Sequence, residues 1–370
     1  MQNLSRYVMF GLIIILIIVI FFALGSIKPQ IKQPTLIKNI SINGTSSEVT
    51  DIAITPDSRY VYVSSDSSAT ISVISTSNNT LIKSIKIGRQ DYTYPSGLAI
   101  NANGSYVYVA DWGSGMISVI STTNYTIIDN ITIGSNPGWL SITPNGKYVY
   151  ATANNIYVIS TSNNTVVGVI KSKGEGSNQI AFTPNSKYAY VAACCISNSN
   201  ALSVISTSNY TVVNTISVEG LPFDVSIMPN GEYAYVTSLN GIYVIATSNN
   251  TLVDTISSVN SPYDITFIPS GQYAYVTGMK EIYVISTFNN SIIYAFGDAN
   301  IPESVATTQT SKYVYISNLK SNTVSVLSTP ILISTGISLS YIIAIAILIA
   351  LITAIYLSPR IKKKKITISN

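Results

Sequence analysis

The sequence predicts an all-β fold, a seven-bladed β-propeller with four-stranded blades. The main observation is a turn followed by a strand in which tyrosine alternates with a small aliphatic residue. This unit recurs seven times at spacings of roughly 40 to 46 residues, the period of a propeller blade. A composition low in charge, with 26 tyrosines, also favours strands. The copies begin at Tyr60, Tyr106, Tyr148, Tyr188, Tyr233, Tyr273 and Tyr313.

Each copy contains four short runs typical of strands. In four of the copies a proline turn, such as Pro144, Asn145 and Gly146, precedes the tyrosine strand, and proline fixes φ while glycine tolerates positive φ. A second run (71–76 in the first copy), an Asn-rich turn and a third run (81–87) follow. A fourth run lies just before the next proline turn. Four strands in this period predict one blade.

The two ends of the repeat region complement each other. Residues 35–42 closely match residues 80–87, the last strand of a blade, whereas the seventh copy stops at Pro330 without its last strand. We therefore expect the N-terminal run to complete blade seven and to close the ring. Closure removes the open sheet edges that invite aggregation.

The repeats resemble the YVTN-type β-propeller repeat of archaeal surface-layer and related proteins. Residues 235–237 and again 275–277 read Tyr-Val-Thr, which nearly spells the name. The resemblance covers about residues 36–329 and implies the propeller fold. It leaves function open, because such repeats serve as scaffolds, as binding domains and occasionally as enzymes.

Two apolar segments flank the repeats and predict a membrane protein. Residues 7–25 carry no charge and have the length to span a bilayer, although cleavage as a signal peptide before Ser26 is the alternative. Residues 337–357 form a second span, followed by Arg360 and by lysines at 362–365. This basic cluster places the C-terminus in the cytoplasm and the propeller outside it.

The expected domain order follows from these segments. It comprises an N-terminal anchor or signal peptide (1–25), a linker (26–35), the propeller (36–329), a linker (330–336), a transmembrane helix (337–357) and a basic cytoplasmic tail (358–370). In a four-stranded meander, the third strand runs towards the face at which the fourth begins. Both linkers therefore leave from the face of the proline turns, and we expect this face to look towards the membrane.

Charge and composition restrict the function. Six of the 20 cations and none of the 16 acids lie outside the repeats and their linkers, so the middle of the chain is slightly negative and a nucleic-acid partner is not implied. The chain has no histidine, which excludes a Ser/His/Asp triad, a His-ligated metal and haem attachment. We expect no cofactor and no bound metal, and the enzyme question stays open with a preference for a non-catalytic role.

Ten Asn-x-Ser/Thr sequons within the repeat region are candidate N-glycosylation sites. Six of them occupy the same turn in successive copies, where a glycan would project from the rim. The alternative is that Asn suits this turn and Ser or Thr suits the strand after it. The sequons are at Asn39, Asn43, Asn78, Asn103, Asn124, Asn130, Asn163, Asn209, Asn249 and Asn289.

Polar residues recur at one position of the run before each proline turn. This position should lie near the mouth of the central channel, so three carboxylates could converge on a cation or a polyol. The alternative is that these residues cap strand starts and accept hydrogen bonds from loop amides. The candidates are Asp51, Trp139, Gln179, Asp224 and Asp264, with Gly97 and Ser304 at the remaining two positions.

A second candidate site lies in the loops on the opposite side from the proline turns. A mixed group of aromatic and charged residues suits a carbohydrate or protein partner. The group comprises Arg89, Asp91, Tyr92, Tyr94, Asp111 and Trp112.

The adjacent Cys194 and Cys195 are not a metal motif, because two cysteines without histidine leave a zinc site incomplete unless acids supply the remaining ligands. Neighbouring Cα atoms lie ~3.8 Å apart, which strains a disulfide, so two free thiols are expected.

Together these features predict a membrane-anchored, extracytoplasmic propeller that acts as a non-catalytic binding or structural module of the cell envelope. Its expected partners are the membrane and an envelope protein or glycan, as in a surface layer. The competing prediction is an extracytoplasmic metal-dependent hydrolase or lactonase, of the kind seen in related propellers, with its metal on Asp51, Asp224 and Asp264.

Overall fold

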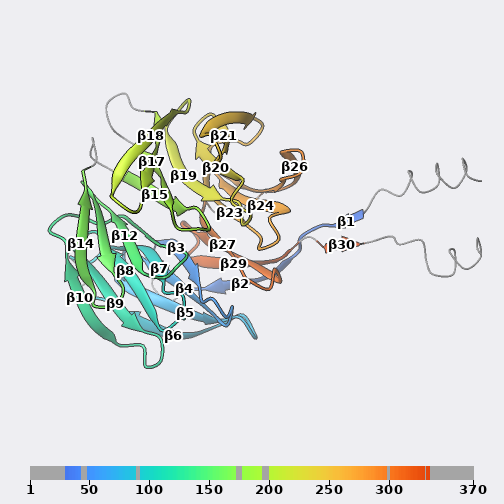
Figure 1. The fold of residues 1–370 in the computed structure, drawn as a ribbon. Helices are drawn as coiled ribbons and strands as arrows, with labels where there is room; N and C mark the ends of the chain where they lie inside the picture. Colours follow the sequence, from blue (N-terminus) through green and yellow to red (C-terminus); the bar gives the residue numbers. More distant parts are fainter. Residues whose placement is uncertain are drawn as a thin grey trace, which may run out of the picture. The chain divides into compact units, whose positions relative to one another are not determined.

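The computed structural model describes residues 30–42, 48–88, 92–171, 177–193, 200–297, 301–329 and 331–333. Its strands form seven four-stranded antiparallel sheets arranged as the blades of a propeller (Figure 1), which confirms the predicted fold class. The first strands of successive blades contact each other around the centre, and the fourth strands form the circumference.

The innermost strands of blades one to seven are β3 (Val49–Ile54), β7 (Pro95–Ile100), β11 (Trp139–Ile142), β15 (Ser177–Phe182), β19 (Pro222–Ile227), β23 (Pro262–Phe267) and β27 (Pro302–Thr307). The second strands are β4 (Tyr60–Ser65), β8 (Tyr106–Asp111), β12 (Tyr148–Thr152), β16 (Tyr188–Ala193), β20 (Tyr233–Ser238), β24 (Tyr273–Gly278) and β28 (Tyr313–Asn318).

The third strands are β5 (Thr70–Ser75), β9 (Met116–Ser121), β13 (Ile156–Ser160), β17 (Ala201–Ser206), β21 (Gly241–Ala246), β25 (Glu281–Ser286) and β29 (Thr323–Ser328). The outermost strands are β6 (Thr80–Lys86), β10 (Ile127–Thr132), β14 (Thr165–Ile170), β18 (Thr211–Ser217), β22 (Thr251–Ile256), β26 (Ser291–Gly297) and, for blade seven, β2 (Leu36–Ser41).

The second strands begin at the seven repeat tyrosines, as the period predicts. Their side chains are buried on both faces, because each blade is packed between two neighbours. Between blades one and two, for example, Tyr62 and Ile71 pack with Leu98 and Val107 in one cluster. The proline turns reverse the chain through a residue with positive φ, such as Gly146 (69°).

The N-terminal strand closes the ring. β2 pairs with β29 in antiparallel register, with Lys38 opposite Val326, and the Ile42 amide donates to the Asn322 carbonyl at 2.9 Å. Blade seven therefore has its fourth strand from the start of the repeat region, as expected. A separate two-stranded sheet pairs β1 (Gln30–Lys32) with β30 (Ile331–Ile333), within the segments expected to be linkers.

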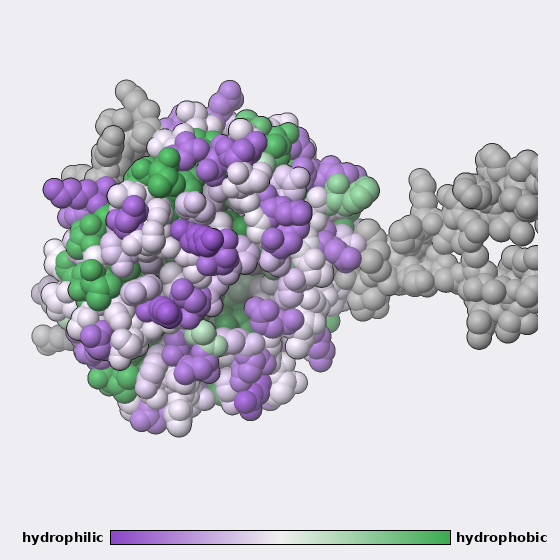
Figure 2. All heavy atoms as spheres, viewed as in Figure 1, coloured by the Kyte–Doolittle hydropathy of each residue, from purple (hydrophilic) through white to green (hydrophobic). Residues whose placement is uncertain are grey.

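All seven outermost strands share a β-bulge near their start. There a Thr or Ser is followed by two aliphatic residues, and the second of these is the extra residue of the bulge. In β6, for example, Leu81 pairs with Ile74 while Lys83 pairs with Val73, so Ile82 is the extra residue. The bulge leaves apolar side chains exposed at the rim, among them Val167, Val213 and Val253. Figure 2 shows hydrophobic patches gathered towards the circumference on the face in view. A bulged, twisted edge discourages pairing with another sheet.

No helix among the described residues is long and apolar enough to cross a membrane. The expected spans at 7–25 and 337–357 lie outside the described residues.

Candidate functional site

The propeller has two faces, which differ in the connections they carry. We call the side at which the innermost strands begin the loop face. It carries the loops before each innermost strand and those between second and third strands. We call the other side the turn face. It carries the proline turns, the Asn-rich turns, and the start and end of the repeat region. At that place the Ser328 amide donates a hydrogen bond to the Thr35 carbonyl at 2.9 Å.

The three candidate aspartates lie buried at equivalent positions of β3, β19 and β23, and each carboxylate accepts a hydrogen bond from the next blade. Asp51 accepts from the amide of Leu98 at 2.7 Å. Asp224 accepts from Ile265 at 2.9 Å, and Asp264 accepts from Val305 at 2.8 Å. These carboxylates therefore join one blade to its neighbour.

The Ser304 hydroxyl continues this chain across the boundary between blades seven and one. It donates to Asp51 at 2.9 Å, and the other contact of that oxygen is the Ile52 amide at 2.8 Å. Asp224 accepts in the same way from its own neighbour, Val225, at 2.6 Å. The inner ends of blades five, six, seven and one are thus connected through side chains.

A hydroxyl in the second strand provides a parallel connection in the same four blades. In blade five, Thr237 accepts from the Asp224 amide at 3.0 Å and donates to the Tyr263 carbonyl of blade six at 2.6 Å. In blade one, Ser64 donates to the Ser96 carbonyl of blade two at 2.7 Å. Thr277 and Ser317 make the equivalent contacts to Glu303 and Thr50.

Blades two to four lack this arrangement. Ala110 and Ala192 occupy the hydroxyl position in β8 and β16, and Thr152 stays within its own blade, where it accepts from the Trp139 amide at 3.2 Å. Between blades two and three, the Gly97 amide instead donates directly to the Gly138 carbonyl at 2.9 Å. Trp139 and Gln179 occupy the aspartate position in blades three and four.

Asp51, Asp224 and Glu303 hold protons more tightly than ordinary acids do. Burial raises the pKa of Asp51 to about 7, and the Asp264 charge adds to this, while the hydrogen bond from Leu98 opposes it. Burial and the adjacent Asp264 likewise hold the pKa of Asp224 well above its usual range. Burial also raises the pKa of Glu303 to about 7, opposed by the hydrogen bond from Tyr263.

Glu303 and Tyr263 belong to this site but were not among the sequence candidates. Each stands directly before an aligned position, Ser304 or Asp264, so a second aligned column would have located them. Burial and the neighbouring Glu303 raise the pKa of the Tyr263 hydroxyl, whose ring stacks near Phe223 with centroids 5.4 Å apart.

The space at this cluster is small. A cavity of about 10 Å³ is left between the side chains, which corresponds to about one water molecule and not to a polyol. Among the described residues, no group of three or more acids or cysteines is placed to hold a metal ion. The cavity is lined by Trp139, Gln179, Phe223, Asp224, Tyr263 and Asp264.

An exposed aromatic group lies on the loop face at blade two. The rings of Tyr94 and Trp112 meet edge to face with centroids 6.3 Å apart, and Tyr92 is 68% exposed beside them in sequence. The buried Asp111 fixes both loops, because it accepts from the Tyr94 amide at 2.9 Å and also binds Ser114. Arg89 and Asp91 lie outside the described residues.

The loop face also contains an open depression of about 650 Å³ between blades four and five. Its lining is polar and includes Glu219, Asn200 and Asn240. Cys194 and Cys195 lie outside the described residues.

The six turn sequons share one geometry on the turn face. In each, the Ser or Thr hydroxyl donates to the Asn amide oxygen at 2.8 or 2.9 Å, as Thr80 does to Asn78. The six asparagines are exposed. Asn39 and Asn130 instead accept from Ser325 and Ser118 of the adjacent strand. Exposed Asn103 accepts from the Ser105 amide in the corresponding turn of blade two, which has Ala102 in place of proline, and Asn43 lies outside the described residues.

The residue after the sequon asparagine has a structural role of its own. It adopts positive φ, and where it is Asn it accepts a hydrogen bond from the core tyrosine of the preceding blade, as Asn79 does from Tyr315 at 2.5 Å. Tyr125 replaces this Asn in blade two, and the hydroxyl of Tyr62 then has no partner among the described residues. Tyr150 lacks a partner in the same way beside Tyr210.

Comparison with known proteins agrees with the fold. Residues 19–127 match the family model described as "Lactonase, 7-bladed beta-propeller". A solved structure of Kuenenia stuttgartiensis hydrazine synthase is similar with a TM-score of 0.70 at 19% identity, over 78% of this chain and 97% of that chain. No curated protein matches the chain. A match to under half of the chain and a likeness at this identity support the propeller alone, so the YVTN-type resemblance stays a prediction.

Proposed function

We propose that this protein is a membrane-anchored, extracytoplasmic propeller that binds a cell-envelope glycan or protein through its loop face and does not act as an enzyme. The observation that carries the proposal is the aromatic group of Tyr92, Tyr94 and Trp112. These side chains are 68%, 37% and 52% exposed on loops that the buried Asp111 fixes. Exposed rings held by a rigid support suit the apolar face of a sugar or an aromatic-rich protein interface.

The same face exposes further large apolar side chains. Leu239 and Met279, in the loops between second and third strands of blades five and six, are 47% and 61% exposed. A glycan would use the aromatic group alone, whereas a protein partner would extend across the face to these residues.

The buried carboxylates support the non-catalytic role. Asp51, Asp224 and Asp264 already accept hydrogen bonds from backbone amides of the next blade. The space beside them admits about one water. Their arrangement serves the ring itself, and the accessible chemistry of the loop face lies in its aromatic group.

Binding to immobilised envelope polysaccharide and to purified envelope proteins tests this proposal. We expect Trp112→Ala and Tyr92→Ala to weaken binding at least tenfold, because truncating an exposed aromatic anchor removes most of the contact. Phe288→Ala is the matched control, since Phe288 is 97% exposed on the turn face. Equal loss in all three variants, or no loss in the first two, would exclude the loop-face site.

The second candidate, a hydrolase or lactonase, is favoured by the family match over residues 19–127. It requires a carboxylate to act as metal ligand or base. Lactone hydrolysis that depends on a divalent cation, and that is lost in Asp224→Asn while the fold is retained by circular dichroism, would replace the binding role with this one. Gln179→Ala, at the equivalent position of blade four, is the control.

N-glycosylation of the turn sequons is a further part of the proposal. The six turn asparagines are exposed, and their amide groups lie at the circumference. Glycopeptide mapping of the protein from its native membrane should find higher occupancy at these six than at Asn39 and Asn130, which bond to an adjacent strand. Unmodified asparagines at all six turns would reduce the pattern to turn and bulge chemistry.

A further inference from the structure

The two faces of the propeller carry their charges in different places. The loop face has nine of the described acidic residues and four lysines: Glu48, Asp51, Asp66, Asp111, Glu219, Asp224, Asp264, Glu281 and Glu303, against Lys86, Lys171, Lys280 and Lys320. Asp51, Asp111, Asp224 and Asp264 are buried and Glu303 belongs to the inner cluster, so the accessible acids and lysines of this face balance. The turn face exposes the cations Arg59, Lys147, Lys187 and Lys312 and the acids Asp57 and Glu232, while Asp129 and Asp254 accept hydrogen bonds from its Asn-rich turns.

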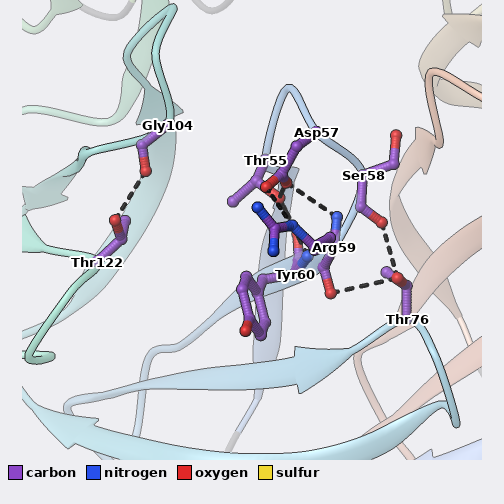
Figure 3. Close-up of polar contacts among 8 residues, drawn as sticks. All are labelled: Thr55, Asp57, Ser58, Arg59, Tyr60, Thr76, Gly104 and Thr122. Atoms are coloured by element: carbon purple, nitrogen blue, oxygen red, sulfur yellow. Dashed lines mark hydrogen bonds and ion pairs between the residues drawn. The ribbon is translucent and has the colours of Figure 1, made fainter.

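The four cations occupy one structural position, the last residue of the turn between first and second strands, in blades one, three, four and seven. This turn contains a proline in the first three of these blades, whereas blade seven has Gln309 in its place. All four are exposed. The backbone at each is held by the residue directly after the third strand: in blade one, the Thr76 hydroxyl donates to the carbonyls of Ser58 (2.7 Å) and Arg59 (3.2 Å), as Figure 3 shows. Thr161 and Thr207 hold Lys147 and Lys187 in the same way. The cations therefore project from a rigid platform at fixed spacing.

Aromatic side chains accompany these cations. A tyrosine follows each one at the start of the second strand, and Tyr188 after Lys187 is 42% exposed. Tyr233, at the same position in blade five but after Glu232, is 36% exposed. Phe288, in the outer turn of blade six, is 97% exposed on the same face. Cations interleaved with tyrosine and an uncovered phenylalanine suit the boundary between lipid headgroups and water.

The position of the two ends of the repeat region indicates what binds the turn face. Thr35 and Ser328 are hydrogen-bonded to each other on the turn face, so the segments that contain the apolar stretches 7–25 and 337–357 continue from there. We propose that the turn face docks on a bilayer surface rich in anionic headgroups. This inference rests on the proposed membrane anchoring, and it adds a lipid-recognising surface to the anchor.

The expected strength follows from the charge. A Lys or Arg near an anionic membrane contributes ~1 kcal/mol, about fivefold in binding. Arg59 contributes less, because Asp57 lies 2.7 Å from its guanidinium. Lys147, Lys187 and Lys312, which form no ion pair among the described residues, should therefore dominate, although the Lys312 ammonium lies over the Tyr313 ring at 4.7 Å. Their effect should fall with added salt.

Hydroxyl-radical footprinting of the full chain in nanodiscs tests the docking. In phosphatidylglycerol discs, oxidation of Tyr188, Tyr233 and Phe288 should be at least fivefold slower than in phosphatidylcholine discs. Loop-face Tyr92, Trp112 and Met279 should react equally in both. Turn-face residues that oxidise at the same rate in both lipids would overturn the proposal.

Charge reversal provides matched variants. In K147E/K187E/K312E the protection should disappear, whereas K171E/K280E/K320E, which reverses three exposed lysines on the loop face, should retain it. Protection that survives the first variant would contradict an electrostatic contact. Protection of the turn face by soluble polyphosphate without any bilayer, equal to that in anionic discs, would replace lipid by an anionic polymer and overturn the assignment.

Flotation separates this inference from the anchor on which it rests. A chain that fails to float with phosphatidylcholine vesicles refutes the membrane anchor. In that case, salt-reversible flotation with phosphatidylglycerol vesicles that is lost in K147E/K187E/K312E would still support the docking surface. If the chain also fails to float with phosphatidylglycerol vesicles, both the docking surface and the anchor are refuted.

Discussion

The two halves of the propeller ring are joined in different ways although their backbones form the same blades. Blades five, six, seven and one are joined through buried side chains, by carboxylates such as Asp224 and hydroxyls such as Thr237. Blades two and three are joined at the centre by a direct backbone contact, in which the Gly97 amide reaches the Gly138 carbonyl and the Ser96 hydroxyl donates to the same carbonyl at 2.7 Å, with no carboxylate between them. The half fastened by side chains contains blade seven, in which the two ends of the repeat region are held without a covalent link, by the hydrogen bonds of β2 with β29 and by the packing of Ile40 and Ile42 against Val324 and Val326. The repeat thus specifies the blade, and individual residues specify how neighbouring blades are held.

Removing residues 35–42 should lower the free energy of unfolding more than any single substitution in the ring. The deletion removes β2 and leaves β29 as an open edge, so we expect the free energy of unfolding to fall by at least ~5 kcal/mol, since a whole strand ladder and its buried side chains are lost. Chemical denaturation of the purified chain measures it. Denaturation indistinguishable from the intact chain would refute closure by β2.

The side-chain half should also respond to pH. The folded-state pKa of Asp51, about 7, exceeds its ordinary value of 3.8, so the folded protein binds this proton more tightly than the unfolded chain. Its contribution is therefore fully present below about pH 4, and is lost as pH rises towards 7, with an upper limit of ~4 kcal/mol.

Comparing the wild type with Asp51→Asn isolates this contribution. The difference in unfolding free energy between the two should change steeply between pH 4 and 7 and then level off. A difference that stays constant over this range would show that Asp51 titrates normally. Gln179→Ala, at the same position in the other half of the ring, should leave the pH profile of the wild type unchanged.

The backbone-joined half should be sensitive to a single methyl group. A Cβ at Gly97 would lie 2.6 Å from the Cα of Trp139, whereas a Cβ at Gly138 would meet nothing within 4 Å. We expect Gly97→Ala to cost ~3 kcal/mol, because two backbones must separate, and Gly138→Ala to cost less than ~1 kcal/mol. Equal thermal shifts in the two variants would contradict the close approach.

The smallest expected difference concerns the core tyrosines. Tyr315 donates to Asn79 of the next blade, while the buried hydroxyl of Tyr62 has no partner among the residues that the structure describes. Tyr315→Phe should therefore cost ~1 kcal/mol, and Tyr62→Phe should be neutral or slightly stabilising. The denaturation midpoints of the two variants measure this difference. A larger loss of stability in Tyr62→Phe than in Tyr315→Phe would count against the hydrogen bond between Tyr315 and Asn79.

Much of the fold could be predicted because its signals are local and repeated. The tyrosine runs mark the start of every second strand, and the likeness between residues 35–42 and 80–87 was enough to predict the closure by β2. The pairing of β1 with β30 has no such signal, because three-residue strands beside Pro34 and Pro330 look like linkers. The bulges were also hidden, since two adjacent aliphatic residues read as part of a continuous strand.

The site could be predicted less well. The aligned column identified Asp51, Asp224 and Asp264, but their hydrogen bonds depend on which amide of the next blade lies opposite, and this is fixed by tertiary packing. Glu303 and Tyr263 stand directly before aligned positions. The column that holds them also contains Gly138 and Phe223, so only this adjacency, and no shared polarity, indicates them. The aromatic group at Tyr94 and Trp112 combines two loops that the chain separates by a whole hairpin.

Because β2 closes the ring, folding of the propeller can be completed only after its partner strand β29 has been synthesised. β2 precedes every other strand of the ring in the chain, yet its partner β29 follows them all, so the ring stays incomplete until almost the whole repeat region exists. During that interval the aliphatic pair Leu36 and Ile37 lies on an unpaired strand, a species prone to aggregation. Pro34 and Lys38, on either side of this pair, are residues that resist pairing with foreign strands. The strand that completes the propeller therefore carries its own protection for the period before its partner arrives.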